Sequence, residues 1–296
     1  MSGATATFDT VAEERPVGLW TDAFRRMRRN PAAIIGALIV GGMVFMAVLA
    51  PILAPYDPTR GNLSESFLPP SPQHWMGTNI QGQDVLSRII FGARLTLGIA
   101  VLSVTLGLLV GGFLGAVAGY FKGTIDAVIM RTVDIMLAIP GLLLAIGIVT
   151  FLGRGVVQVA MAIAIVNVPI FARLLRSGLL GLREADYVIA ARSVGVRGPA
   201  LLTRHMLPNA VGPLIVQATL ALATAVVDAA ALGFLGLGPP DPRTPEWGMM
   251  LSDTYRYLNE AVWLAFFPGF MIVLSVVGFN LLGDGMREAL DPRLRR

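Results

Sequence analysis

The sequence predicts an all-α, polytopic membrane protein with six transmembrane helices, and three observations support this fold class. Of its 296 residues, 55% are hydrophobic and only 14% are charged, and the mean hydropathy is +0.69. Soluble domains carry about a quarter charged residues. Six apolar runs are each long enough to cross a hydrocarbon core of about 30 Å. Most of the 23 basic residues fall in segments on one side of these runs, as the positive-inside rule requires.

The amino-terminal residues 1–31 are predicted to form a cytoplasmic tail. Residues 1–17 have no hydrophobic periodicity and are expected to be disordered. A helical face beside four arginines follows, which is typical of an interfacial helix on the inner leaflet; a basic anchor before the first span is the alternative. The face consists of Leu19, Trp20, Phe24 and Met27, beside Arg25, Arg26, Arg28 and Arg29. The next apolar run is longer than a signal-peptide core and lacks a cleavage site, which argues against a signal peptide.

The six spans divide the rest of the chain. They are predicted at residues 32–54, 95–118, 125–152, 156–175, 210–232 and 262–282. The first span and a polar, proline-marked outer segment occupy 32–94, a core with five spans occupies 95–283, and 284–296 form a cytoplasmic tail. Six spans place both termini on one side. Because that side also carries most arginines, the long loop 176–209 is expected to face the cytoplasm with both termini.

Charged residues inside the spans are informative, because each costs at least about 2.5 kcal/mol at the bilayer centre. Arg131 and Asp134 are three apart in the third span and can pair on one helical face. Pro140 should kink that helix. One interpretation is a hinge and a polar wall along a substrate path. The other is an ion pair near the inner interface that helps helices pack.

Two further positions are candidates for the path. Asp228, near the outer end of the fifth span, could line an outer gate or cap the glycine-rich loop that follows. Asn167, before Val168 and Pro169 in the fourth span, could open backbone carbonyls to the path or simply pack against another helix.

Glycines in and just after the second span indicate close helix contact. Gly107, Gly111, Gly115 and Gly119 follow a spacing of four, and small residues at this spacing let helix backbones approach each other. The sequence leaves open whether the partner helix belongs to this chain or to another.

The loop 176–209 contains a helix–glycine–helix pattern. Residues 184–192 have helix-forming composition, and Tyr187, Ala190 and Ala191 are expected to share one face. Gly195 should end this helix, Gly198-Pro199 can open a second one, and Leu207-Pro208 should close it. A loop of this length usually works or is disordered, and its composition is not that of a disordered segment. The pattern favours a compact docking element, with a solvated connector as the alternative.

This loop resembles the coupling loop of ATP-binding-cassette importer permeases. The signature of that loop is an alanine pair, a glycine four residues on, and a Leu-Pro pair a dozen residues later. Ten residues of the loop, which we call the coupling residues, are implied to contact ATP-binding subunits. They are Asp186, Tyr187, Ala190, Ala191, Arg192, Gly195, Arg197, Arg204, Leu207 and Pro208. His205 and Asn209 also match the peptide-importer variant. Ile189 departs from the glutamate that often precedes the alanine pair.

The resemblance covers nearly the whole chain from residue 25 and is closest to the C-type permease subunit of dipeptide and oligopeptide importers. Matching segments are 28–31, 77–78, Gly82, 84–88, 92–94, 234–238, 244–245, 247–248, 279–284 and 291–293. Asn79 and Gln83 depart, since the family usually has an aspartate and an arginine there. The resemblance implies a type I importer permease fold, six helices with a cytoplasmic coupling helix, in a bacterial inner membrane.

The resemblance also implies partners. A homologous B-type permease subunit would complete the path, two ATP-binding subunits would dock beneath, and a substrate-binding protein would dock on the acidic outer loop 233–261. Membrane lipid is the surrounding solvent. The rival interpretations are an importer of another cargo, such as a nickel chelate or a glycoside, and a self-contained secondary transporter. The secondary transporter would need an internal inverted repeat, which the sequence does not show.

No catalytic site is expected in this chain. The only lysine, Lys122, does not stand in a phosphate-binding G-x-x-x-x-G-K-[ST] motif. The ATP and magnesium that the resemblance implies are expected on the partner subunits, and the chain is not expected to be an enzyme. It has no cysteine, and its two histidines, His74 and His205, lie far apart, so no metal site is expected. The pI near 9.9 accompanies a net charge of only +4, and we expect no nucleic-acid partner.

Overall fold

The computed structural model describes residues 24–290, and within this range the chain is almost entirely helical, with one isolated bridge between Thr78 and Asp84. Five helices are long and apolar enough to cross a membrane: α2 (Pro31–Val48), α4 (Val85–Phe121), α7 (Val156–Leu182), α10 (Leu207–Phe234, continuous with the turns that start at Gly198) and α12 (Trp263–Leu290). A bent pair, α5 (Gly123–Ala138) and α6 (Gly141–Leu152), makes a sixth span if it is counted as one. The predicted all-α, six-span fold class is confirmed.

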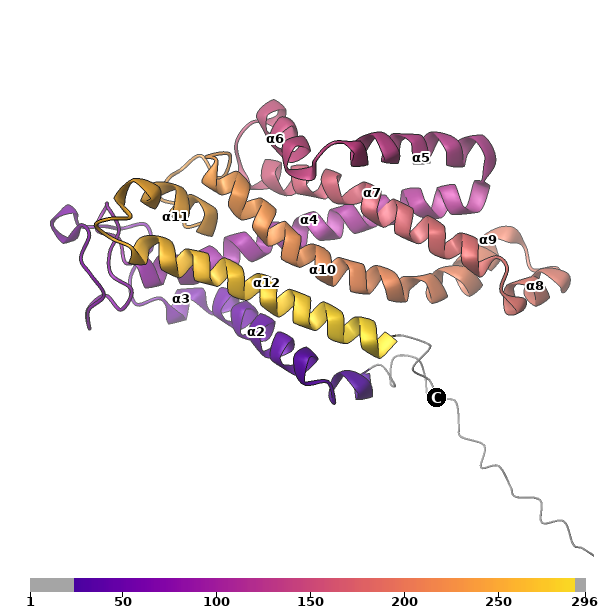
Figure 1. Cartoon of the computed structure of the whole chain (residues 1–296), viewed down its shortest axis with the longest axis horizontal. Helices are drawn as coiled ribbons and strands as arrows, with labels where there is room; N and C mark the ends of the chain where they lie inside the picture. Colours follow the sequence, from indigo (N-terminus) through magenta and orange to yellow (C-terminus); the bar gives the residue numbers. More distant parts are fainter. Residues whose placement is uncertain (1–23, 291–296) are drawn as a thin grey trace, which may run out of the picture.

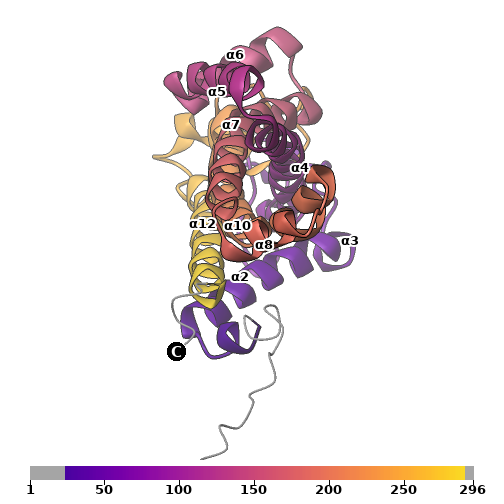
Figure 2. The ribbon, with the colours of Figure 1, turned by 90° about the vertical axis from the view of Figure 1, so that its right-hand side faces the viewer.

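The long helices lie side by side along the longest axis of the molecule (Figure 1). Helices α4 and α7 form the central pair, and α10 packs against both. In both views α2 lies at one edge with α12 beside it, and α5 and α6 lie at the other edge (Figures 1 and 2). We call the end with the start of α2, α8 (Asp186–Ser193) and the end of α12 the α8 end. The opposite end holds α3 (Ala50–Leu53), the segment 54–84 and α11 (Trp247–Thr254).

Local sequence signals explain where the helices begin. Asn30 caps α2 by accepting a hydrogen bond from the Ala33 amide, and Pro31 occupies the first helical position, where its missing N–H costs nothing. Asp84 caps α4 in the same way through the Ser87 amide. The first span, predicted to start at residue 32, therefore starts one residue earlier, at Pro31.

The glycine row on α4 packs against α7 of the same chain, which answers the question left open by the sequence. A Cβ added at Gly111 would lie 2.4 Å from the Val168 carbonyl oxygen, and one at Gly115 would lie 2.5 Å from the Ala172 carbonyl oxygen. Gly107 and Gly119 face side chains of α7, with an added Cβ 2.9 Å from Asn167 Cβ and 3.1 Å from Leu179 Cβ. Only glycine allows this approach of two backbones.

The third predicted span is broken rather than gently kinked. Helices α5 and α6 meet at 97°, with Ile139 ending the first and Pro140 preceding the second. The predicted kink at Pro140 is confirmed, and the bend is larger than the sequence indicated. Proline removes a backbone donor and pushes the residue before it out of the helical region, and Ile139 is indeed extended, with ψ 132°.

The prediction that Leu207-Pro208 closes the second loop helix is wrong. The turn α9 (Gly198–Ala200) and the π-helical turn η2 (Leu201–Met206) run directly into α10. Pro208 therefore lies inside a continuous helical segment, directly after the π turn. The wide π turn before it accommodates the carbonyl that Pro208 cannot bond.

Other helix ends also extend past the predicted spans. Helix α7 continues to Leu182 and therefore includes the start of the loop assigned to 176–209, and α12 continues to Leu290. The predicted disordered residues 1–17, and Leu19 and Trp20 of the interfacial helix, lie outside the described residues, as do residues 291–296. Residues 24–27 are helical.

Candidate functional site

Helix α8 projects at one end of the molecule, beyond the ends of α4 and α10 (Figures 1 and 2). It ends in a Schellman motif: the Gly195 amide bonds to the Arg192 carbonyl at 3.0 Å, and the Val196 amide bonds to the Ala191 carbonyl at 3.1 Å. Gly195 has φ +87°, a region that residues with a Cβ enter only at a cost. The predicted helix break at Gly195 is confirmed.

The base of α8 is fixed to the bundle. Val188 is fully buried, and Ala191 is half-buried against the core. Arg183, just before α8, donates to the Tyr120 carbonyl near the end of α4. Gly198, just after α8, packs against the Tyr120 side chain, and a Cβ added there would lie 2.5 Å from the Tyr120 hydroxyl. These contacts on both sides make α8 a rigid extension of the helical bundle.

The outward face of α8 is apolar and exposed. Tyr187 is 42% exposed, Ile189 47% and Val194 81%, and Ala190 is also exposed. Tyr187, Ala190 and Val194 follow helical spacing, so they share this face. Ala191 lies one turn after Tyr187 and is half-buried, so it forms the inner border of this face. Burial raises the pKa of the Tyr187 hydroxyl, which bonds weakly to the His205 carbonyl at 3.4 Å.

The remaining coupling residues surround this face. Asp186 lies in the first turn of α8 and Arg192 in its last turn, where their charges complement the helix dipole. Arg197 and Arg204 are exposed on the segment that returns to α10. Leu207 is half-buried and Pro208 exposed at the start of α10. Asn209 stabilises this return by donating to the His205 carbonyl at 2.7 Å.

The predicted pair between Arg131 and Asp134 is wrong. Asp134 instead forms its ion pair with Arg173 on α7. Arg131 is exposed on α5, and we find no partner for it among residues 24–290. Both side chains line a shallow hollow on the outer surface of α5. Asp134 therefore ties α5 to the bundle, while Arg131 is left facing outward.

A second ion pair between the same helices was missed. Asp126 on α5 binds Arg176 on α7 through two hydrogen bonds, of which Arg176 Nη2 to Asp126 Oδ2 is 2.6 Å. Two-point arginine–carboxylate pairs are among the stronger polar contacts. The arginines stand three apart in the sequence, Arg173 and Arg176, and this spacing on one helix face was the available signal.

Asn167 and Asp228 differ in their surroundings. Asn167 is buried, donates to the Ile163 carbonyl of its own helix at 2.9 Å, and packs against Gly107. This favours the packing interpretation for Asn167. Asp228 is half-buried on α10, and we find no group within residues 24–290 that donates a hydrogen bond to its carboxylate. Glu246 approaches Gly233 in the last turn of α10, just before the glycine-rich loop that Asp228 was considered to cap.

Glu246 is a fully buried carboxylate at the end opposite α8, and sequence analysis missed its role. It accepts hydrogen bonds from the amides of Gly248 and Met249, which caps α11, and from the Thr96 hydroxyl of α4. A Cβ added at Gly233 would lie 2.1 Å from Glu246 Oε2. Burial raises the pKa of Glu246 above its ordinary value of 4.5. Glu246 therefore joins α4, α10 and α11.

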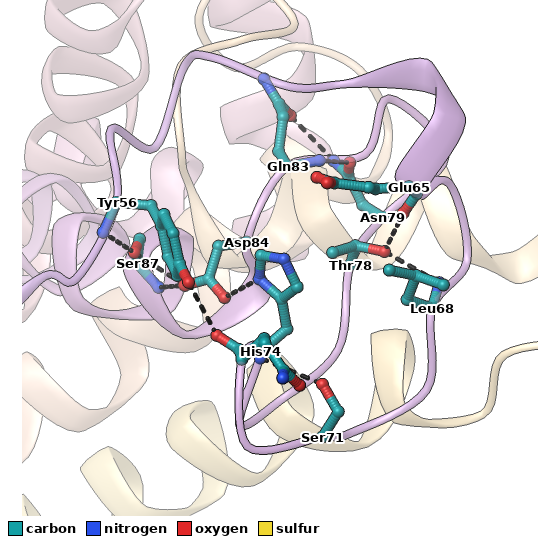
Figure 3. A network of polar contacts seen from close by, with 11 residues as sticks. Tyr56, Glu65, Leu68, Ser71, His74, Thr78, Asn79, Gln83, Asp84 and Ser87 are labelled. Carbon is teal, nitrogen blue, oxygen red and sulfur yellow. Dashed lines mark hydrogen bonds and ion pairs between the residues drawn. The ribbon is translucent and has the colours of Figure 1, made fainter.

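Arg88, at the start of α4, is a second buried charged residue that joins separate segments at this end. Its guanidinium is buried and donates to the Gln83 side chain at 2.7 Å and to the carbonyls of Pro58 at 3.1 Å and Arg243 at 3.0 Å. Gln83 in turn accepts from Asn79 at 2.8 Å (Figure 3). The two departures from the family pattern thus contact each other, as a neutral amide pair.

The outer segment 54–84 folds over the end of α4 through a second polar network (Figure 3). His74 Nδ1 lies 2.9 Å from Asp84 Oδ1, and the other Asp84 oxygen accepts from Ser87. The Ser87 hydroxyl also accepts a hydrogen bond from the backbone amide of Tyr56. The side-chain hydroxyl of Tyr56 donates to the Gln73 carbonyl. His74 is therefore a structural residue of this cap, far from His205.

Taken together, a six-span bundle with a rigid projecting helix at one end and a capped loop layer at the other defines a multi-pass membrane permease subunit. The chain belongs to the family described as binding-protein-dependent transport system inner membrane component, whose profile matches residues 107–296. Residues 18–70 match the N-terminal transmembrane domain of oligopeptide transport permease C.

Curated relatives match over nearly their whole length. A dipeptide transport system permease protein of Alkalihalophilus pseudofirmus is 46% identical, covering 94% of this chain and 91% of the relative. A di/tripeptide transport system permease protein of Pseudomonas aeruginosa is 46% identical, covering 100% and 98%. A glutathione transport system permease protein of Pectobacterium atrosepticum is 39% identical, covering 98% and 96%.

Among solved structures, an inward-facing MetNI methionine ABC transporter contains a chain of the same fold. It aligns with a TM-score of 0.58 at 19% identity, covering 70% of this chain and 97% of that chain. At this identity the likeness shows the fold alone. The importer permease fold expected from the sequence is therefore confirmed.

Proposed function

We propose that this chain is the permease subunit of an ATP-driven importer of dipeptides or oligopeptides. It forms half of the translocation path and pairs with a homologous B-type permease subunit. Two ATP-binding subunits dock at the α8 end, and a substrate-binding protein delivers peptide at the opposite end. Peptide cargo is supported by the names of the relatives, which transport dipeptides, tripeptides or glutathione.

The exposed apolar face of α8 is the observation that carries this proposal. A fixed helix that presents Tyr187, Ile189, Ala190 and Val194 to water is costly in a soluble environment and is typical of a protein interface. Val188 buries the base of α8, and Arg183 just before it bonds to the Tyr120 carbonyl of α4. A displacement of α8 by a docked subunit would therefore also move α4, α7 and α10. A solvated connector would need neither the apolar face nor the anchoring.

The α8 end is proposed to face the cytoplasm, together with both termini. Arg192, Arg197 and Arg204 lie exposed at this end, and the start of α2 brings further arginines to it. ATP and magnesium bind to the partner subunits in this proposal, and the chain itself carries out no hydrolysis. Its work is conformational.

The path itself is proposed to run along the side of the bundle where α5 and α6 lie. Their surfaces are largely exposed in this single chain, and Arg131, Asp134 and Pro140 all lie on them. A second permease subunit would cover this side and enclose a path. Asp228 on α10 is the remaining polar candidate, with an outer gate as its proposed role. Asn167 contributes through packing.

Two substitutions test the coupling role. Ala190→Trp places a bulky ring on the docking face, and Gly195→Val strains the φ +87° turn that ends α8. We expect each variant to insert normally but to lose most of the peptide transport, together with ATPase docking or substrate-stimulated ATP hydrolysis. The readout is the reconstituted transporter with its partners.

Thr203→Trp is the matched control, because Thr203 is exposed on the same loop but outside α8. It should transport like the parent protein. Normal docking, hydrolysis and transport in both the Ala190→Trp and the Gly195→Val variants would overturn the coupling role. A cargo other than peptides would appear separately, as normal coupling without peptide-stimulated hydrolysis.

A further inference from the structure

A basic cavity lies at the α8 end, between the segment that precedes α2 and the last turns of α12. Its volume is about 560 Å³, and its polar lining comes from Arg26, Arg29, Asn30 and Glu288. These residues come from two segments far apart in the sequence, which are brought together because α2 and α12 pack along each other. The proposed transport function uses none of them.

The charge of the cavity favours an anion. Within residues 24–290, neither Arg26 nor Arg29 has an ion-pair partner. Glu288 is the one acidic group in the lining, and it accepts a hydrogen bond from Asn30 Nδ2 at 2.5 Å. Two guanidinium groups against one carboxylate leave a net positive charge. Guanidinium is suited to binding phosphate, because its planar set of donors matches two phosphate oxygens.

The position of the cavity distinguishes a lipid from a soluble anion. Pro31 starts the first span, so the arginines immediately before it lie at the level of the lipid headgroups. Just beyond them, Ile34, Ile35 and Leu38 of α2 are exposed apolar side chains, which in a bilayer contact acyl chains. A phospholipid carries both matching groups, a phosphate for the basic cavity and acyl chains for the apolar side chains of α2.

We propose that this cavity binds the headgroup of an anionic phospholipid. Basic pockets between transmembrane helices are suited to such headgroups. The bound headgroup would lie between Arg26 and Arg29 of the segment before α2 and the last turns of α12. This site is independent of the cargo and of ATPase docking, and it requires only that α2 spans the membrane.

The test compares two double variants of the full chain, purified in detergent with the subunits that accompany it. Arg26→Gln/Arg29→Gln removes the charges that line the cavity. Arg25→Gln/Arg28→Gln removes two charges from the same segment outside the cavity, where Arg28 stacks on Phe24 at 4.5 Å. Native mass spectrometry with added phosphatidylglycerol, phosphatidylcholine or glycerol 3-phosphate then measures binding.

We expect a preference for phosphatidylglycerol, and a loss of roughly tenfold in its affinity in the first variant only. Glu288→Gln should bind phosphatidylglycerol more tightly than the parent chain, a gain that misfolding cannot produce. Equal losses in both double variants would mean general surface attraction and would overturn the site. Glycerol 3-phosphate binding as tightly as the lipid would overturn the lipid assignment, and no loss in either variant would overturn both.

Discussion

Single buried polar residues hold the end of the molecule opposite α8 together, and Glu246 is the clearest case. Its carboxylate accepts from two backbone amides of α11 and from Thr96 of α4, while Trp247 beside it donates to the Ile89 carbonyl at 3.0 Å. A buried carboxylate is costly unless its hydrogen bonds are made. Removing these bonds should therefore loosen the contacts between α4, α10 and α11.

Glu246→Ala should destabilise the protein by about 2–4 kcal/mol, because a helix cap is lost and three donors lose their acceptor. Glu246→Gln keeps one acceptor oxygen and should cost about half as much. The two variants and the parent protein can be compared by thermal unfolding in detergent. Equal stability of the alanine variant and the parent would contradict this role.

The pH dependence of the same comparison follows from the raised pKa of Glu246. The folded state keeps the proton of Glu246 at pH values where the unfolded state has lost it. The protonated carboxyl therefore contributes to the free energy of unfolding, and this contribution falls as pH rises from about 4.5 through the folded-state pKa. Below 4.5 it is complete. The parent should therefore gain stability relative to Glu246→Gln as pH is lowered from 7 toward 4.5, and a constant difference would show that the carboxyl is not perturbed.

Residue partners were the least predictable part of the sequence. Arg131 and Asp134 satisfy the spacing rule for a helix pair, yet Asp134 pairs with Arg173 on another helix. The sequence cannot rank a neighbour on the same helix against a partner that only the packing of α5 on α7 provides. Glu246 stood out only as part of an acidic loop, because its burial depends on the same kind of long-range packing.

At the scale of helices, the contact between α4 and α7 depends on the glycine row. Gly111→Ala and Gly115→Ala would each place a methyl group about 2.4–2.5 Å from a backbone carbonyl of α7, and a backbone cannot rotate away as a side chain can. Overpacking of this kind costs about 1–3 kcal/mol. Both variants should melt at lower temperature than the parent protein.

Gly112→Ala is the matched control, since nothing lies within 4 Å of the Cβ it would add. It has the same change in helix propensity and should be neutral or slightly stabilising. Melting temperatures in detergent provide the measurement. Equal destabilisation at all three positions would show that flexibility, and not close contact, is what these glycines supply.

Helix positions were predictable where hydrophobic length and proline decide them. The apolar runs predicted the spans, including the start of α2 to within one residue, and Gly195 predicted the end of α8. The extent of the break at Pro140 was not predictable, because the packing of α6 on α7 sets the 97° angle. Leu207-Pro208 misled for a similar reason, since a π turn lets the helix continue past the proline.

At the scale of the whole molecule, the two ends have different characters. The end opposite α8 is a layer of short helices and loops joined by buried polar groups such as Arg88, Glu246 and Asp84. The α8 end presents an apolar helix and exposed arginines. The family resemblance and the uneven distribution of arginines predicted this difference between the two ends. The face of α8 that would meet a partner could not be assigned from spacing, because the choice between Ala190 and Ala191 depends on where Val188 is buried.

The central claim, that α8 is a cytoplasmic docking helix for ATP-binding subunits, can be tested with one cysteine. The chain has no native cysteine, and Val194 is the most exposed apolar residue of this loop at 81%. A Val194→Cys variant should resist a membrane-impermeant thiol reagent in intact cells. In inside-out vesicles it should react only after the ATP-binding subunits are stripped away. Labelling in intact cells would contradict the orientation, and equal labelling with and without those subunits would contradict the docking.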